Sequence, residues 1–382
     1  MNTYSRLLFP KQLRHRRFYN HHVKMVQRDI SIPREDSIPH EVRTSSEPRQ
    51  NRLYNARLSC IHQVNPNVRL LRLTIPQDQG DELDKQQPFT FLPGQWLDVH
   101  IPSIPQAGGF TITSTPADAQ VLPSPAPPTE SLSVEEEGVP PVGPRGREPY
   151  VELAVQESPS SPPAAWLWRP KEEILGKQLS IRVGGSFVWP PSGIDLGQIT
   201  NIVFVAGGVG INPLISILSH LNDNDPSSTL PHQSNIHFLY STRLSQVPTT
   251  HKTASSGTVE TTLNQILFLP RLRQIAQSLS QSGRLRVSLD LFITNLSPRS
   301  TEHPVSALLE SPPTDFGIHP RRMHKQDLRD AVSVSRLDRG KQSTVCYVCG
   351  PPNMTDEVVG VLNEMLGDDD DARSRILYEK WW

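Results

Sequence analysis

Cysteine is scarce in this chain, and its scarcity excludes one broad class of protein. Only Cys60, Cys346 and Cys349 occur in 382 residues, too few for a disulfide scaffold, so a reducing compartment is expected. Long apolar runs are missing too, since none approaches the roughly 18 to 20 residues of a membrane span. A basic surplus is also absent, because 38 Lys and Arg face 39 Asp and Glu. These absences argue against a secreted disulfide protein, a membrane span and a nucleic-acid surface.

Proline, by contrast, is abundant. The chain holds 37 prolines and 22 glycines, its hydrophobic fraction is 36% and its mean hydropathy is -0.42. This composition supports packed cores together with long segments outside them. At the usual domain size of one to two hundred residues, the length predicts two or three domains.

The N-terminal region has a charge of its own. Residues 1–28 carry seven basic side chains and no acid, the composition of a mitochondrial transit peptide, and matrix localisation is therefore expected. An ordinary disordered basic tail remains the alternative. Residues 29–56 are interpreted as a disordered polar linker.

Alternating apolar and polar residues begin near Leu58. The pattern predicts consecutive antiparallel strands over residues 57–192, whose spacing fits a small β-barrel or a sandwich. The expected strands are 58–64, 68–75, 94–101, 108–114, 150–156 and 178–183. Within this region, residues 116–149 contain nine prolines and an acidic run, which predicts a disordered insertion.

The pattern changes in the second half of the chain. Over residues 198–382, short apolar runs alternate with helical stretches, which predicts a doubly wound parallel sheet. Helices are expected near 262–278, near 323–333 and from about 353. Three polar stretches are interpreted as loop insertions, at 223–233, 246–257 and 297–320.

A glycine turn at 207–210 follows one buried strand and opens an apolar helix. Gly208, Gly210 and Pro213 give the spacing GxGxxP. Glycine permits a positive φ and lets the backbone approach a pyrophosphate, whose charge a helix N-terminus favours. Alone, such a turn fits an ordinary tight turn equally well.

A second glycine turn follows the apolar run 344–349. Asn353 is expected to cap the helix after it, and the strand end shares the carboxyl edge at which open α/β sheets bind ligands. A redox or metal role for Cys346 and Cys349 is the alternative. It is disfavoured because side chains three apart on a strand point to opposite faces. Cys346 is expected in the core.

Together these motifs resemble the ferredoxin-NADP reductase superfamily. The resemblance spans about residues 58 to 382 and lies in the segments PGQWLDVHIP, GGFTITSTP, AWLW, RVGGSF, VFVAGGVGINPLISIL, CYVCGPPNM and YEKWW. It implies a six-stranded ferredoxin-reductase-type barrel that binds FAD and a second domain that binds NAD(P)H. Hydride transfer from nicotinamide to flavin would then feed an unidentified acceptor, a protein or a small molecule.

The resemblance also assigns site residues. It implies catalytic roles for Cys349 and for a terminal Trp381 or Trp382 covering the flavin, with Gly350 and Pro351 beside the nicotinamide. The remaining implied contacts are Gly207, Gly208, Val209, Gly210, Ile211 and Asn212 for the nucleotide, and Phe110, Thr111 and Thr113 for the flavin.

Two departures leave the function open. Gly108 stands where the family's Arg-x-Tyr-Ser flavin motif has arginine, and residues 161–164 replace its Gly-x-x-Ser turn. The leading hypothesis is a flavin-dependent NAD(P)H oxidoreductase. The alternative is a nucleotide-binding assembly or regulatory protein that has lost the flavin, in which Phe110 is barrel core and the tryptophans dock the chain end. The choice between NADH and NADPH stays open, although Arg243, after the second strand of the parallel sheet, could hold a 2′-phosphate.

Overall fold

A computed structural model describes residues 38–76, 88–121, 148–223, 230–244, 256–296, 313–333, 343–367 and 369–381. The chain divides into two units, 1–34 and 35–382, and every described residue belongs to the second. The expected transit peptide therefore lies outside the described residues, as do Trp382 and most of the expected insertion 116–149.

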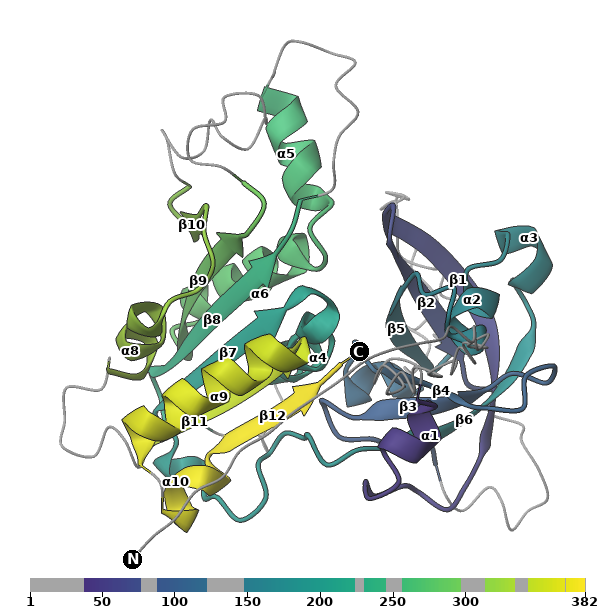
Figure 1. Cartoon of the computed structure of the whole chain (residues 1–382), viewed down its shortest axis with the longest axis horizontal. Coiled ribbons are helices and arrows are strands. Elements are labelled where there is room, and N and C mark those ends of the chain that lie inside the picture. Colours follow the sequence, from purple (N-terminus) through teal and green to yellow (C-terminus); the bar gives the residue numbers. More distant parts are fainter. Residues whose placement is uncertain are drawn as a thin grey trace, which may run out of the picture. The chain divides into compact units, whose positions relative to one another are not determined.

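The first half of the described chain forms the expected antiparallel barrel. Its strands are β1 (Tyr54–Asn65), β2 (Val68–Thr74), β3 (Trp96–His100), β4 (Gly108–Thr111), β5 (Tyr150–Gln156) and β6 (Gln178–Gly184), in the order β4-β3-β6-β1-β2-β5 (Figure 1). The edge strands close on one another, because Ile112 bridges Leu153 and the Thr113 amide donates to the Glu152 carbonyl at 2.8 Å. Alternate residues of β5 and β6 fill the interior, which confirms the period-two pattern.

Short helices surround these strands. They are α1 (His40–Arg43), η3 (Pro116–Ala119), α2 (Pro162–Leu167) and α3 (Lys171–Ile174). The helix η3 lies inside the stretch that was expected to be disordered.

The prediction of a disordered linker over residues 29–56 is wrong from residue 38 onward. Residues 38–52 pack on the barrel, and β1 already begins at Tyr54. The reason is a fully buried carboxylate, Asp98 of β3, which binds His40 at 3.1 Å, Arg49 at 3.0 Å and Arg182 at 2.7 Å. Polar composition alone could not reveal these partners, which lie far apart in sequence.

The second half forms the expected parallel sheet, in the order β10-β9-β8-β7-β11-β12. The strands are β7 (Asn201–Gly207), β8 (Ser234–Thr242), β9 (Leu285–Ile293), β10 (Gly317–His319), β11 (Thr344–Gly350) and β12 (Ile376–Lys380). The strand β10 is a correction, since it lies within the expected loop 297–320 and pairs with β9. A three-residue strand is too short for an alternating pattern to show.

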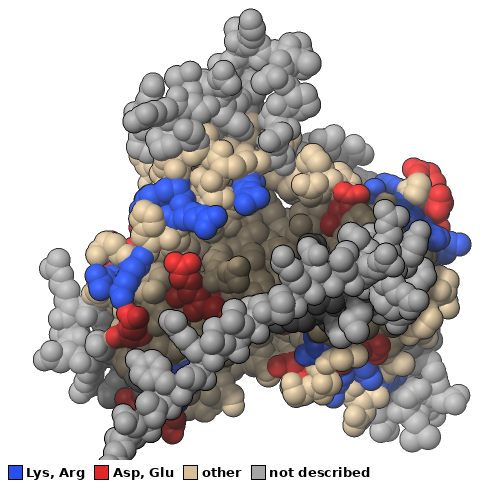
Figure 2. Space-filling model, viewed as in Figure 1, with Lys and Arg blue, Asp and Glu red and all other residues tan. Residues whose placement is uncertain are grey.

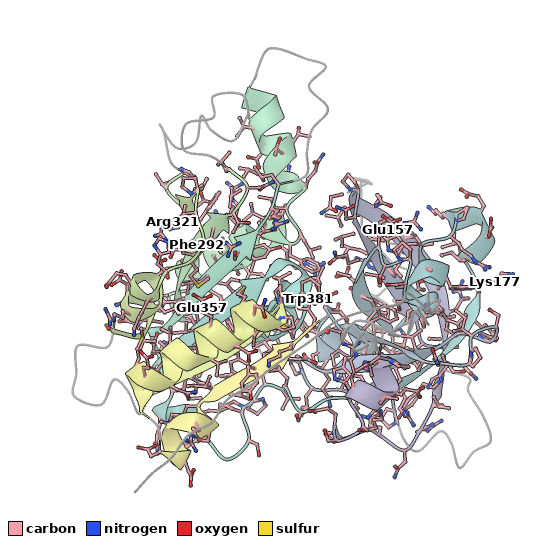
Figure 3. All side chains as sticks on the ribbon, viewed as in Figure 1. Glu157, Lys177, Phe292, Arg321, Glu357 and Trp381 are labelled. Carbon is pink, nitrogen blue, oxygen red and sulfur yellow. The ribbon has the colours of Figure 1, made fainter. Side chains whose placement is uncertain are left out.

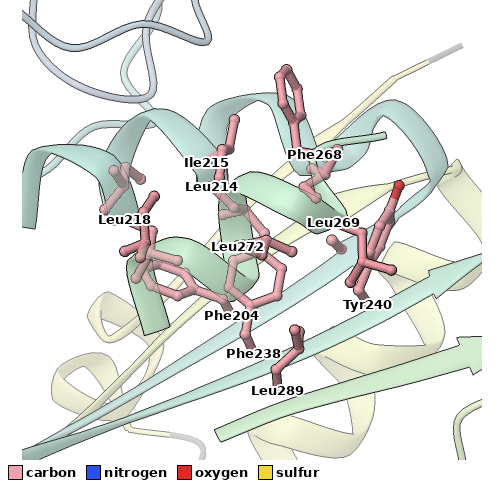
Figure 4. Packing of buried hydrophobic residues seen from close by; sticks show 14 of the residues in the cluster. Phe204, Leu214, Ile215, Leu218, Phe238, Tyr240, Phe268, Leu269, Leu272 and Leu289 are labelled. Carbon is pink, nitrogen blue, oxygen red and sulfur yellow. The ribbon is translucent and has the colours of Figure 1, made fainter. Parts of the chain in front are cut away.

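Helices cover both faces of this sheet. They are α4 (Ile211–Asn222), α5 (Ser256–Asn264), α6 (Leu269–Gln281), α8 (Lys325–Ser333), α9 (Pro352–Leu366) and α10 (Asp370–Ser374). One face packs against α4 and α6, where Phe204, Leu214 and Leu272 share a cluster (Figure 4). The other packs against α8 and α9, through Val205, Leu328 and Leu362.

The helix expected near 262–278 is instead two helices. Phe268 adopts a left-handed conformation with φ of 59°, and Pro270 is the second residue of α6. Proline lacks an amide hydrogen and its ring clashes with the preceding turn, so one continuous helix cannot pass through this point. In addition, Ser256 and Gly257, expected in a loop, begin α5.

Two further findings concern the surface charge and the character of the helices. Lys and Arg are interspersed with Asp and Glu on the face in Figure 2. Among the described residues, no helix combines the length and the apolar character of a membrane span.

Candidate functional site

The two glycine turns meet at the carboxyl edge of the parallel sheet. Strands β7 and β11 are neighbours, with Ala206 opposite Cys349. A Cβ added to Gly210 would overlap the carbonyl oxygen of Cys349, and one added to Gly207 would stand 2.6 Å from the Met354 sulfur. Only glycine permits so close an approach. The structure thus brings together the two turns that the sequence singled out.

The first turn leads directly into helix α4. Gly208 has φ of +57°, and residues 208–210 form a 3-10 turn before Ile211. Among the described residues no side-chain hydrogen bond caps α4, so the first amides of the helix lie at the turn, where the helix dipole is positive. Ile211 is fully buried, whereas Gly208 and Val209 are partly exposed.

Asn212 has a different environment from the one expected. Its Nδ2 donates to the Ala154 carbonyl of β5 at 3.0 Å, and its Oδ1 is buried without a hydrogen-bond partner among the described residues. One helical turn later, Ser216 Oγ donates to the Ser114 carbonyl at 2.7 Å. Asn212 therefore binds α4 to the barrel rather than extending toward a nucleotide.

The second turn begins helix α9 without the expected cap. The N-cap is Pro351, no side chain caps the helix, and Asn353 is its second residue. The expectation for Asn353 is wrong because proline is favoured in the first helical turn, where its missing amide hydrogen is not needed, so Pro352 starts the helix one residue earlier. Thr355 closes the turn from within, since its hydroxyl donates to the Gly350 carbonyl at 3.1 Å.

Cys349 lies at the end of β11 with a buried, neutral thiol. Burial, and then the negative charge of Glu379, raises the pKa of Cys349 well above its usual value. Its side chain belongs to the cluster on the α4 face, whereas Cys346 belongs to the cluster on the α9 face. The two cysteines thus point to opposite sides, as expected, and they do not form a pair. A neutral thiol is a poor nucleophile.

Glu379 is a candidate site residue that the sequence reasoning missed. It pairs with Cys349 across the β11–β12 register, and its Oε2 is buried without a hydrogen-bond partner among the described residues. Burial, and then the nearby Glu47, raises the pKa of Glu379 to about 8. Its detectable signal was a carboxylate in the final strand, two residues before a terminal tryptophan.

Trp381 covers the first turn. Its backbone amide donates to the Gly350 carbonyl at 3.2 Å, and its indole Nε1 donates to the Gly207 carbonyl at 3.0 Å. Figure 3 shows it at the carboxyl end of β12. The indole therefore connects both turns, while the alternative catalytic candidate, Trp382, lies outside the described residues.

The three expected flavin contacts lie in the barrel, and each has its own local environment. Phe110 packs on the barrel core, and its ring lies 2.5 Å from the point where Gly108 would carry a Cβ. Thr111, at the end of β4, is half-buried. Thr113 is fully buried, and its hydroxyl donates to both the carbonyl and Oε1 of Glu152.

Thr113 also lines a polar cavity. Its volume is about 540 Å³, and it lies between the barrel and helices α4 and α6. Glu152, at its wall, is bound by Arg271 of α6 at 2.8 Å. The cavity lies at the C-terminal end of α4, whereas the glycine turn lies at its N-terminal end.

Comparison with known proteins gives the site a context. Residues 199–362 match the family described as the ferric reductase NAD binding domain. The chain is 29% identical over 343 residues to oxidoreductase NAD-binding domain-containing protein 1 of Xenopus laevis, which covers 90% of this chain and 84% of the relative.

Solved structures share the two-domain fold. The CS-b5R domains of human Ncb5or, in their NAD+ form, align with a TM-score of 0.52 and 15% identity over 86% of this chain and 69% of that one. A ferredoxin NADP+ reductase from Neisseria gonorrhoeae, with bound FAD and NADP, aligns with a TM-score of 0.50 and 12% identity over 87% and 100%. The expected fold class is thus confirmed.

Proposed function

Because residues 199–362 match the ferric reductase NAD binding domain family, we propose that this chain is an oxidoreductase that uses NAD(P)H at the edge formed by β7 and β11. The observation that carries the proposal is the contact of the two turns, in which Gly210 leaves no room for a side chain against Cys349. That contact brings the two turns side by side at the carboxyl edge of the sheet, where dinucleotides bind in such folds.

The diphosphate of the nucleotide would lie at residues 207–211. Backbone amides and the positive end of α4 supply attraction for a doubly charged group without a basic side chain. Gly208 reaches its positive φ at no steric cost. Asn212 is not part of this contact set, because the barrel holds its amide.

The nicotinamide would lie between Cys349 and Trp381. At neutral pH the Cys349 thiol and the Glu379 carboxyl are both largely protonated, since burial raises the pKa of each group. Two neutral donors at this point can orient the carboxamide of nicotinamide without attracting its positively charged oxidised form. Glu379 can also hold a proton beside the reacting ring.

The choice between NADH and NADPH as the coenzyme stays open. Strand β8 ends at Thr242, and Arg243 follows it, exposed. A guanidinium there is suited to the 2′-phosphate of NADPH. The variant Arg243→Gln is expected to weaken NADPH binding alone, whereas equal weakening of both coenzymes would exclude this role.

The resemblance names FAD as the hydride acceptor, and the Neisseria gonorrhoeae structure is described with bound FAD and NADP. In this chain Gly108 stands where the resemblance expects the arginine that binds the flavin phosphate. The proposal therefore covers binding of the nucleotide and transfer of its hydride to an unidentified acceptor, a protein or a small molecule. A nucleotide-binding regulatory role is the second candidate, because glycine replaces the expected arginine at position 108.

Titration of the purified chain with NADH and NADPH tests the proposal, with tryptophan fluorescence as the readout. The variant Gly208→Ala places a methyl group in a left-handed conformation facing the Trp381 ring, and binding is expected to weaken about tenfold or more. Gly360→Ala is the matched control, because open space surrounds this helical glycine. Absence of saturable binding in the wild-type chain would refute the proposal.

We also propose that residues 1–28 direct the chain to mitochondria, on the strength of their seven basic residues and absence of acids. Fusion of residues 1–37 to a fluorescent protein is expected to produce mitochondrial fluorescence. Replacement of the seven basic residues by glutamine should abolish it, and diffuse fluorescence of the unmodified fusion would contradict the proposal.

A further inference from the structure

The strand β4 has lost the space in which a flavin-phosphate arginine would lie. Gly108 and Phe110 share one face of β4. A Cβ at position 108 would stand 2.5 Å from Phe110 Cε2 and 2.6 Å from the Pro163 Cβ. Real Cβ atoms do not make such short contacts, so no longer side chain can start there unless Phe110 or α2 moves.

The helix next to that position lacks two of the amide donors that would hold a phosphate. Helix α2 begins with Pro162 and Pro163, and its N-cap Ser161 makes no side-chain hydrogen bond. A helix N-terminus holds phosphate through its first free amides, but proline has no amide hydrogen. The two positions that should donate to a phosphate are therefore both without a donor.

The basic residue that reaches α2 is engaged at the other end of the helix. Arg69 donates to the carbonyls of Leu167 and Arg169 and stacks on Trp168, with its guanidinium carbon 4.5 Å from the ring centre. This is the favourable arrangement for a cation at a helix C-terminus. It places the positive charge away from Gly108.

Hydrogen bonds also join the barrel to helix α4 of the α/β domain. Asn212 donates to the Ala154 carbonyl, and Ser216 donates to the Ser114 carbonyl. The Thr113 hydroxyl, which the resemblance assigned to flavin, is held by Glu152. The Asn212 amide nitrogen and the Ser216 and Thr113 hydroxyls are thus bound to protein groups, whereas Asn212 Oδ1 has no partner among the described residues.

We infer that the barrel holds no resident FAD or FMN: the Phe110 ring and the Pro162–Pro163 start of α2 fill the place of the flavin phosphate. The barrel instead acts as a fixed wall for the nucleotide site, joined to α4 by Asn212 and Ser216. This inference rests on the proposed function and deepens it, because it states that no flavin is bound beside the proposed nucleotide site.

The full chain, expressed in flavin-replete cells, provides the test. It is purified, incubated with excess FAD or FMN, desalted, and then denatured to release flavin for fluorescence measurement. Separate titrations follow the quenching of free flavin fluorescence. We expect no flavin above background after desalting and no saturable binding up to about 100 µM of either flavin.

NADH or NADPH binding, measured on the same preparation by tryptophan fluorescence, distinguishes the two proposals. Near-stoichiometric flavin, or saturable flavin binding below about 100 µM, would overturn the inference and leave the nucleotide site intact. Absent nucleotide binding with absent flavin would sustain the inference and refute the proposed function. Circular dichroism confirms that the protein is folded in each case.

Discussion

The indole nitrogen of Trp381 donates a hydrogen bond to the carbonyl oxygen of Gly207 at 3.0 Å, which joins the last described residue to the first glycine turn. The same residue reaches the second turn through its backbone amide, which donates to Gly350. The end of β12 is therefore part of the nucleotide edge, although it lies more than 170 residues after Gly207 in the sequence.

The variant Trp381→Phe tests this relationship. It removes the indole donor while keeping an aromatic ring, and we expect a loss of about 0.5–1.5 kcal/mol in the free energy of unfolding. It should also remove most of the fluorescence change caused by NADH, since Trp381 lies over the turn. Trp166→Phe, a half-buried barrel position, is the control. An unchanged NADH signal would place the nucleotide elsewhere.

The buried carboxylate of Asp98 predicts sensitivity to acid. Burial opposes the ionised form, but hydrogen bonds from His40, Arg182 and Arg49 outweigh it and hold the pKa of Asp98 far below its usual value. Since the folded-state pKa is depressed, this stabilisation is complete above the unfolded-state pKa near 4 and is lost as the pH falls below it.

The variant Asp98→Asn is therefore expected to lose about 2–4 kcal/mol of unfolding free energy at pH 7, because two partly buried guanidinium groups, those of Arg49 and Arg182, lose their charged partner. The difference from wild type should shrink in urea titrations at pH 3. Glu148→Gln is the control: its ion pair with Arg57 is exposed, and such pairs contribute less than about 1 kcal/mol. A constant difference at both pH values would contradict the assignment.

Glu379 predicts the opposite dependence on pH. Burial, and then Glu47, raises the pKa of Glu379 to about 8. Between the unfolded-state pKa near 4.5 and about 8, the folded chain keeps a proton that the unfolded chain has released, so stability declines as the pH rises.

The variant Glu379→Gln should remove about 1–2 kcal/mol of that decline. Urea unfolding at pH 5 and pH 8.5 measures it, with the exposed Glu157→Gln as control (Figure 3). A decline as steep in the variant as in wild type would show that Glu379 titrates normally.

Phe110 is expected to stabilise the barrel. Because its partly buried ring packs on the barrel core, Phe110→Ala should cost about 2–3 kcal/mol of unfolding free energy, below the value for a fully buried ring. The control Leu175→Ala, at a side chain 39% exposed, should cost about 0.5 kcal/mol or less. A loss as small as that of the control would mean that the ring is free, which would also weaken the case against a flavin.

Local patterns predicted the elements of this protein well. The strands at 150–156 and 178–183 were readable because alternate residues of each fill the barrel interior. The turn at Gly208 was readable because glycine suits its positive φ, and the turn at Gly350 because it follows an unbroken apolar run. The opposite orientations of Cys346 and Cys349 followed from strand geometry alone. Such features depend on a few neighbouring residues.

Other features depended on partners distant in sequence. The segment 38–52 looked like a linker because the buried Asp98, nearly 50 residues after Arg49, could not be recognised as its partner. Glu379 became a site residue only through its register with Cys349.

The sequence by itself determined the two-domain order, the nucleotide turns and the missing flavin arginine, because each is a property of a short segment. Only the tertiary structure decided that Phe110 and Pro163 fill the space above Gly108, that Asn212 binds the barrel, and that Trp381 joins both turns. These are contacts between distant segments, and their geometry exists only once the cores have packed.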